Sequence, residues 1–433
     1  MKTTMVRSAL ALVLAMPLAA AAQAAANTSA PAAAPEGFKL PFTIYGTLNL
    51  NFQDSKMQGA ANPALNVNPR TLVSTDSSNI GIRGTFDVAS GLQVVYQCET
   101  SAAINGVSVS GICNRNSRVG LGSPVYGTLF YGNWDTPYKA TTFGTKADDP
   151  FYATDVWDFE SILTSPGFNT KTSGWVTGSA TPVTSFAVRL NNTVAYHSPK
   201  WSGVSFRLAY GASYFKNATG TQNPYLYSAC ANYDNGPISV GAGWEQHHDG
   251  FALVAANPAA ALAFGATAAN TAGAANVPMH SSDSAWHVAA GYELGWAAGA
   301  TTLGGMYEQI MLDQSDTPTG SVKSYNRAAW QLTLKHRVGS HELRGRYSMA
   351  DQGSADLVGG AASTTSGYGA SGYAVGYGYF LAPTAQVYLH YTIIQNAHRA
   401  QYTFGTAGSP TIAGATPAGA DPQAIGLGIR YSF

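Results

Sequence analysis

Segments in which apolar and polar residues alternate recur along the whole chain, and this pattern constrains the fold more than any other feature. The last segment is the clearest, because Ile425, Leu427 and Ile429 share one side while Arg430 lies on the other. Alternation with a period of two is typical of a β-strand with one apolar and one polar face. We count sixteen such segments, at residues 42–53, 78–89, 92–99, 115–122, 127–135, 193–198, 203–213, 225–233, 237–247, 285–293, 298–311, 326–338, 341–350, 371–381, 385–396 and 423–433. An even number of two-faced strands predicts an all-β, closed antiparallel barrel.

The connections between these segments are sorted by length. Those after even-numbered segments are tight and rich in turn residues, as at 234–236 and 339–340. Those after odd-numbered segments are mostly long, including 136–192, 248–284 and 397–422. Tight turns on one rim and long loops on the other predict an outer-membrane barrel with short periplasmic turns and long extracellular loops. A soluble sandwich has no reason to sort its loops in this way.

Composition and the amino-terminal end agree with a membrane barrel. Charged residues make up only 11% of the chain, yet no mature segment has the eighteen consecutive apolar residues of a helical span. Composition alone leaves a secreted sandwich open. Residues 1–26 have the basic start, the apolar run and the small residues of a secretory signal peptide. We therefore expect a signal peptide at 1–26, an Ala/Pro-rich tail at 27–41 and a transmembrane barrel at 42–433 in the Gram-negative outer membrane.

The period of two also separates a lipid face from a water face on each strand. In segment 78–89, Ile80 and Ile82 form the apolar face, which places Arg83 inside the barrel. An arginine facing lipid near the bilayer centre costs roughly 2–4 kcal/mol, so the phasing is enforced energetically. The same phasing predicts a pore-lining basic wall of Arg83, Arg118, Arg207, Arg344, Arg346 and Arg430, accompanied by Gln97, Glu99, Glu245, Glu342 and His390.

The long loop 136–192 is the candidate for a constriction. It contains several aromatic residues, and a loop of this length with its own aromatic side chains is expected to be ordered. Its acidic residues are Asp148, Asp149, Asp155, Asp158 and Glu160. Folded into the barrel, these carboxylates would face the arginine wall and set up a transverse electric field. An exposed outer loop is the alternative.

Two local features leave alternatives open. Cys98 and Cys113 flank a short loop and could form a disulfide, with Cys230 left single, but all three could equally serve as small apolar fillers. Residues 251–278 are dominated by alanine, but proline, glycine and asparagine interrupt them. We assign this stretch to a long outer loop of low complexity, with a short helix over the pore mouth as the alternative.

Several short stretches, taken in order, resemble the Gram-negative general porins, the sixteen-stranded trimeric family. The matching stretches are residues 45–46, 116–121, 127–138, 149–151, 192–199 and 428–433. The resemblance implies a homotrimer, a third loop folded inward, and passive diffusion of small hydrophilic solutes and ions. By position it puts Arg83 and Arg118 on the basic wall, and Asp148, Asp149 and Asp155 on the constriction loop.

Two positions depart from the pattern of these porins. Asn133 stands where many relatives carry a basic residue, and Tyr431 stands where histidine is common. The first departure argues against strong anion selectivity. The second changes little, since tyrosine also suits the aromatic girdle at a membrane interface.

A water-filled channel is therefore the main functional hypothesis, surrounded by outer-membrane lipid and lipopolysaccharide. The alternatives are a channel that prefers a sugar or an organic anion, and an adhesin or receptor that uses the long loops. An enzyme is not expected, because the chain has neither an H-E-x-x-H nor a G-x-S-x-G motif. His247 and His248 beside Asp249 could mimic a catalytic group but fit a polar surface better. We expect no cofactor and no metal, and with a net charge near minus two after cleavage we expect no nucleic acid partner.

Overall fold

The fold is described from a computed structural model of the chain. The residues that it describes are 42–75, 77–106, 111–141, 146, 160–168, 171–172, 185–212, 224–249, 251–252, 280–315, 322–359, 365–404 and 416–433. The expected signal peptide at 1–26 and the tail at 27–41 lie outside these residues, and so does most of the alanine-rich stretch 251–278. Among the described residues, no helix is long and apolar enough to cross a bilayer.

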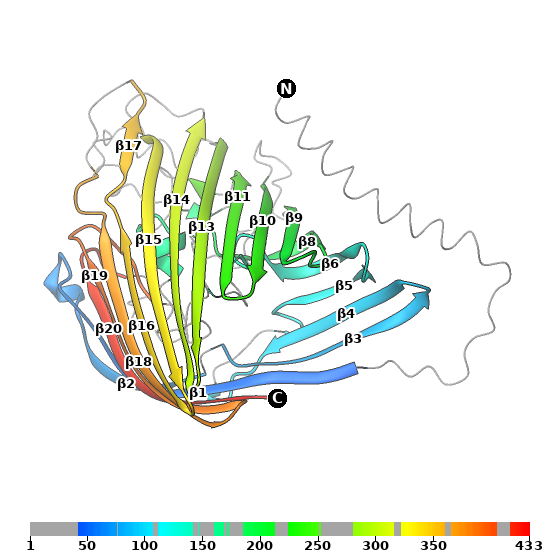
Figure 1. Cartoon of the computed structure of the whole chain (residues 1–433). Helices are drawn as coiled ribbons and strands as arrows, with labels where there is room; N and C mark the ends of the chain where they lie inside the picture. Colours follow the sequence, from blue (N-terminus) through cyan, green and yellow to red (C-terminus); the bar gives the residue numbers. More distant parts are fainter. Residues whose placement is uncertain are drawn as a thin grey trace.

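Sixteen antiparallel strands follow one another around a single closed sheet (Figure 1). They are β1 (Phe42–Gln58), β3 (Asn79–Ala89), β4 (Leu92–Ser101), β5 (Ser117–Ser123), β6 (Gly127–Asp135), β8 (Arg189–His197), β9 (Val204–Ala212), β10 (Tyr225–Asn235), β11 (Ile238–His248), β13 (His280–Trp296), β14 (Gly299–Ser315), β15 (Val322–Val338), β16 (His341–Ala350), β18 (Ala370–Ala382), β19 (Ala385–Asn396) and β20 (Asp421–Ser432). Each of the sixteen segments found in the sequence corresponds to one of these strands. The predicted sixteen-stranded antiparallel barrel is confirmed.

The barrel closes where the last strand pairs with the first. Strand β20 pairs with β1 continuously, from Thr47 opposite Ser432 to Gln58 opposite Asp421. The backbones of Gly46 and Phe433 extend this seam by exchanging two hydrogen bonds of 3.1 and 3.0 Å. Because β1 also pairs with β3 on its other side, the sheet has no open edge there. Lipid offers backbone groups no hydrogen-bonding partner, so a sheet that spans a membrane must close in this way.

Several strands continue beyond their predicted ends on the rim of the long loops. Strands β13, β14 and β15 are each 17 residues long. Two short strands that the sequence analysis did not predict, β2 (Val67–Ser74) and β17 (Ser354–Leu357), pair with the outer ends of β1 and β15. Both faces are polar at such ends, as at 280–284 of β13, so hydrophobic periodicity no longer marks the strands there.

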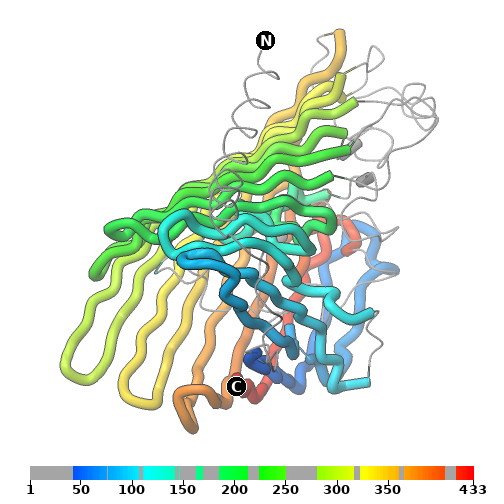
Figure 2. The backbone as a smooth tube through the Cα atoms, turned by 90° about the vertical axis from the view of Figure 1, so that its right-hand side faces the viewer, coloured from blue at the N-terminus to red at the C-terminus, as the bar shows by residue number. Residues whose placement is uncertain are grey.

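The remaining short elements belong to the connections. They are the 3₁₀ turn η1 (Pro63–Leu65), the helix α2 (Glu160–Thr164) and the two-residue strands β7 (Lys171–Thr172) and β12 (Phe251–Ala252), which pair with each other. At the opposite rim, tight hairpin turns join β13 to β14, β15 to β16 and β18 to β19 (Figure 2). Gly236 and Gly339 sit in such turns with φ values of 56° and 57°, a conformation that glycine adopts without steric cost.

The two faces of the sheet have opposite character. Large apolar side chains are exposed on the outside, among them Val119, Leu332 and Leu427. The inner face carries buried polar residues, such as Asn49, Asn51 and Gln53 on β1. Apolar clusters also occur inside the barrel, where chain segments from the loops pack on the wall. The exposed face therefore suits lipid, and the interior suits water and a packed loop.

The two faces of β3 give a direct test of this arrangement. Ile82 is exposed on the outer side, and Thr85 is exposed on the inner side with Arg83. In lipid vesicles, Ile82→Arg should lower the free energy of unfolding by roughly 2–4 kcal/mol, because the new charge faces hydrocarbon. Thr85→Arg is the matched control and should change it by less than about 1 kcal/mol. A denaturant titration in vesicles measures both, and equal losses would contradict the assigned faces.

Candidate functional site

Three of the predicted basic residues lie along one part of the inner wall. Gln97 of β4 lies between Arg83 of β3 and Arg118 of β5 in the strand register. Further along the sheet, Arg207 of β9 is opposite His197 of β8. This register places the three arginines on the same face as the buried Glu99, which is the inner face.

Two of these guanidinium groups rest on aromatic rings. Arg83 lies 4.5 Å from the ring centroid of Tyr45. Arg118 lies 4.8 and 4.5 Å from the ring centroids of Phe130 and Trp134. Such contacts hold a cation in place without neutralising it. Within the part of the chain that the structure describes, Arg83, Arg118 and Arg207 have no carboxylate within ion-pair distance.

The other three predicted arginines occupy the inner wall on the opposite side of the closing seam. Arg430 of β20 is opposite the buried Asn49 of β1 and Gln386 of β19. Arg344 of β16 donates to Glu342 at 2.6 Å and to Gln386 at 2.7 Å. Arg346 is buried two residues further along β16. The six arginines therefore lie on β3, β5 and β9 on one side of the seam and on β16 and β20 on the other.

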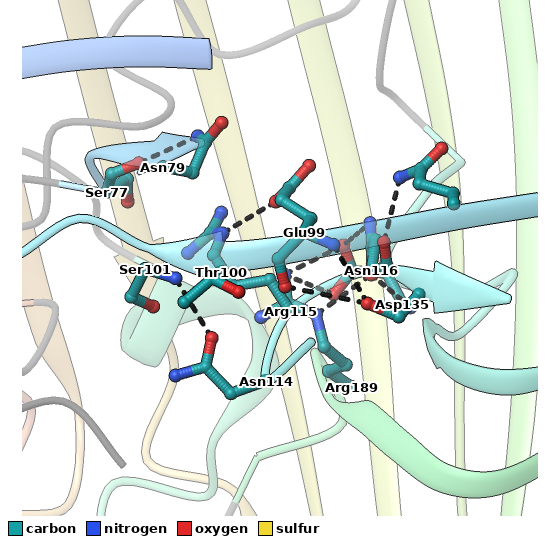
Figure 3. Close-up of polar contacts among 12 residues, drawn as sticks. Ser77, Asn79, Glu99, Thr100, Ser101, Asn114, Arg115, Asn116, Asp135 and Arg189 are labelled. Carbon is teal, nitrogen blue, oxygen red and sulfur yellow. Dashed lines mark hydrogen bonds and ion pairs between the residues drawn. The ribbon is translucent and has the colours of Figure 1, made fainter. Parts of the chain in front are cut away.

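The acidic residues Glu99 and Asp135 are held by cations near the ends of β4 and β6 (Figure 3). Arg115 donates to Glu99 at 2.7 Å, and the hydroxyl group of Tyr45 donates to the same carboxylate at 2.9 Å. Arg189 lies 3.2 Å from Asp135. Asn116 joins this second group, because its amide donates to Asp135 at 2.7 Å. Each of these carboxylates has an arginine partner, which reduces its contribution to the electrostatic potential of the lumen.

A disulfide lies beside this network. Cys98 of β4 is bonded to Cys113, which precedes Arg115 in the following loop. Cys230 of β10 is a buried free cysteine. The bond joins residues 15 positions apart and so restrains the loop that supplies Arg115.

The loop after β6 enters the barrel and is fixed there by a buried chain of polar contacts. Tyr138, three residues after β6, donates its hydroxyl hydrogen to Glu308 of β14 at 2.7 Å. Glu308 lies 3.5 Å from Arg327 of β15. Arg327 in turn donates to the carbonyl oxygen of Leu163 in α2 at 2.7 Å and also to that of Ser165. One ion pair on the wall thus holds two parts of the same loop.

Apolar packing reinforces this anchor. Ile162 and Leu163 of α2 are buried against small residues of the wall, including Ala329, Ala350 and Ala374. Alanines at these wall positions leave room for the helix. Tyr402 and Phe404, from the connection between β19 and β20, complete the same cluster. The backbone of Gln401 donates to Gly167 at 2.8 Å, so two loops meet inside the barrel.

Lys146 connects the same loop to the rim of the short turns. Its amine lies 3.0 Å from Asp234, at the end of β10. Asp234 also binds Lys200 at 2.9 Å and accepts a hydrogen bond from Ser239. The loop therefore reaches the end of the barrel opposite the long loops.

Two tyrosines of the inner loops, Tyr138 and Tyr402, are fully buried in this packing. Burial, together with the Glu308 carboxylate, raises the pKa of Tyr138 well above its usual value. Burial also raises the pKa of Tyr402 to about 12. Both hydroxyl groups stay protonated at physiological pH, so Tyr138 remains a hydrogen-bond donor to Glu308.

Some predicted residues lie outside this description, and one predicted grouping is not formed. Asp148, Asp149, Asp155 and Asp158 lie outside the described residues, and Glu160 is described only by its backbone in α2. His247 is buried against Glu245, with 2.6 Å between Nε2 and the carboxylate. His248 points to the outer face and stacks on Tyr225. The two neighbouring histidines therefore face opposite sides of the sheet and do not form a catalytic group.

The anchor formed by Glu308 and Arg327 was not predicted from the sequence. The alternation of residues along β15 does place Arg327 on the inner face, because Leu332 and Leu334 lie on the outer face. The phasing that selected the other arginines would have selected this one. Its role as a loop anchor depends on a contact with residues 164 positions away and has no local signature.

Loss of the anchor should be measurable. Arg327→Met leaves Glu308 buried without its cation, which should lower the free energy of unfolding by roughly 3–5 kcal/mol. Single-channel recordings of the variant should show larger current fluctuations, because α2 loses its hold on the wall. Arg337→Met, at the other end of β15 where the guanidinium lies 3.7 Å from the Phe380 ring, is the control and should cost less than about 1 kcal/mol. The anchoring role would be contradicted if the Arg327 variant had the same current fluctuations and the same free energy of unfolding as the wild-type protein.

Comparisons with known proteins agree with this architecture. A family model described as Gram-negative porin matches residues 9–399. An outer membrane porin protein of Bordetella pertussis is 27% identical over 183 residues, or 40% of this chain and 42% of that protein. Major outer membrane protein P.IB of Neisseria meningitidis serogroup B is 28% identical over 211 residues, or 48% of this chain and 54% of that protein. The chain thus spans about half the length of the curated relatives that it matches.

Solved structures extend the similarity in fold to most of the chain. The anion-selective porin from Comamonas acidovorans superposes with a TM-score of 0.67 at 18% identity, covering 91% of this chain and 100% of that one. OmpT, an outer membrane protein of Vibrio cholerae, gives a TM-score of 0.56 at 16% identity, covering 92% and 100%. With the family model matching most of its length and the barrel observed, the chain belongs to the Gram-negative porin family.

Proposed function

We propose that the protein is a homotrimeric outer-membrane porin, a water-filled channel through which small hydrophilic solutes and ions diffuse passively. The observation that carries this proposal is a closed barrel with an apolar exterior and a charged interior, in which a loop is fixed to the inner wall. A channel of this kind selects solutes by its radius and its fixed charges, without a chemical step. The family and the fold point to a non-enzymatic channel.

The pairing of the inner charges supports a modest preference for anions. Glu99, Glu308 and Glu342 each have an arginine partner. Arg83, Arg118 and Arg207 have no such carboxylate partner among the described residues and face the same side of the lumen. Uncompensated positive charge in a low-dielectric wall attracts anions and repels cations. The similar fold of a porin named as anion-selective agrees with this proposal.

Conductance in planar lipid bilayers tests the channel itself. The purified protein should give ohmic current steps, and a trimer should give them in groups of three. An adhesin or receptor with a plugged barrel should give none. Correctly folded protein that inserts into the bilayer without conducting would rule out the proposed function.

The reversal potential in a salt gradient tests the charge assignment. Arg83→Ala and Arg118→Ala should each shift the reversal potential toward that of cations, because each removes a positive charge from the lumen. Lys56→Ala removes the same charge from the outer side of β1 and is the matched control. It should leave the reversal potential unchanged. If neither arginine variant differs from the lysine variant, Arg83 and Arg118 do not contribute to the filter.

A further inference from the structure

The disulfide between Cys98 and Cys113 lies next to an ion pair on the inner face of the barrel. Glu99 follows Cys98 on β4 and points inward, whereas Cys98 shares the outer face with Ile82, its register partner on β3. Arg115 lies two residues after Cys113 and donates to Glu99 at 2.7 Å (Figure 3). The bond therefore joins the two chain segments that carry the two charges of this pair.

Tyr45 connects this ion pair to the basic wall. Its hydroxyl group donates to Glu99 at 2.9 Å, and Arg83 lies over its ring, 4.5 Å from the centroid. The ring reaches Glu99 across Gly81, where a Cβ atom would lie 2.7 Å from the ring carbon Cζ. In the described part of the chain, the cation within ion-pair distance of this carboxylate is Arg115 and not Arg83. Arg115 therefore determines how strongly the charge of Glu99 acts on Arg83 and on nearby solutes.

The position of Arg115 depends on the disulfide. Residues 113–115 are also tied to β4 by hydrogen bonds of 2.9 to 3.0 Å. These three residues are only half-buried, so water competes for their polar groups. Cys113 has a φ of 56°, in the left-handed region that residues other than glycine rarely adopt, and the bond to Cys98 holds it there. Without the bond, the backbone at Cys113 is free to relax and to carry Arg115 away from β4.

The disulfide is accessible to small molecules. It lies at the end of β4 away from the tight turn that joins this strand to β3. Both cysteines are half-buried, and Ile112, next to Cys113, is 83% exposed. Two molecules of a small thiol reduce such a bond. The sulfur–sulfur bond breaks, each cysteine gains one electron and one proton, and the two thiol molecules are oxidised to a disulfide.

We propose that the Cys98–Cys113 disulfide sets the charge selectivity of the channel, and that its reduction by a small thiol lowers the preference for anions. This inference rests on the proposed function, because selectivity requires a conducting channel. With the bond intact, Arg115 balances Glu99, and Arg83 presents its charge to solutes. After reduction, Arg115 moves away with its loop, and the Glu99 carboxylate opposes the electric field of Arg83. Arg115 is thus a residue that determines selectivity, and the disulfide positions it.

The reversal potential in a salt gradient, measured before and after reduction, tests this proposal. Dithiothreitol would be added to both sides of a planar bilayer that already contains folded channels, so that folding does not depend on the bond. The ratio of anion to cation permeability should fall by about twofold. Alkylation of the denatured protein, followed by mass spectrometry, should find three free cysteines per chain after reduction in place of one before it.

Variants of the ion pair show whether the bond acts through Arg115. Arg115→Gln should lower the permeability ratio while the bond is intact, and dithiothreitol should lower it no further. Glu99→Gln combined with Arg115→Gln removes both charges, so this variant should keep the wild-type ratio and should not respond to dithiothreitol. Cys230→Ser leaves the disulfide in place and should respond as the wild-type protein does.

Three results would contradict the proposal. The first is an unchanged permeability ratio in channels whose disulfide is shown to be reduced. The second is an equal fall in the wild-type and Arg115→Gln channels, since the bond would then act through other residues. Either result refutes the proposal alone, because the channel still conducts. In the third, folded and inserted wild-type protein does not conduct, which refutes the channel itself and the proposal with it.

Discussion

Pairing of the last strand with the first is the constraint on which the rest of this structure depends. Every backbone amide and carbonyl group at membrane depth needs a partner within the protein, and only a closed sheet gives partners to both edge strands. The pairing of β1 with β20 provides this closure over twelve residue pairs. Once the sheet is closed, each strand has one face toward lipid and one toward the lumen, so charge is directed inward.

Closure alone forms the cylinder, and the interior contacts determine how the loop after β6 lies inside it. The buried pair of Glu308 and Arg327 connects Tyr138 at the start of the inner loop to the carbonyl oxygens at the end of α2. Isolated buried ion pairs add little stability, but removal of one partner is costly. The main effect of this ion pair is therefore to position the loop. It keeps the loop against β14 to β16 and leaves the arginines on β3, β5 and β9 facing the lumen.

The sequence predicted the barrel well because lipid imposes a simple rule on every strand. Alternation placed all sixteen strands and the inward phase of residues such as Arg118 and Arg430. The rule fails where lipid is absent. Strands β2 and β17 lie beyond the apolar belt, and the packing of Tyr402 on α2 joins segments more than 200 residues apart. Contacts between side chains across the lumen depend on shape and burial. They produce no periodic pattern in the sequence. Arg327 illustrates both cases. Its inward position follows from the alternation of its strand, but its contacts with Glu308 and α2 could not be predicted from the sequence.

Permeation of neutral solutes of graded size tests most directly whether the fixed inner loop narrows an otherwise open barrel. Swelling of liposomes that contain the protein would be measured with sugars from monosaccharides to large oligosaccharides. The smallest sugars should enter fast and the rate of entry should fall steeply with sugar size, because the docked loop would limit the radius while water still fills the lumen. Swelling no faster than that of empty liposomes, from protein shown to be folded and inserted, would contradict it.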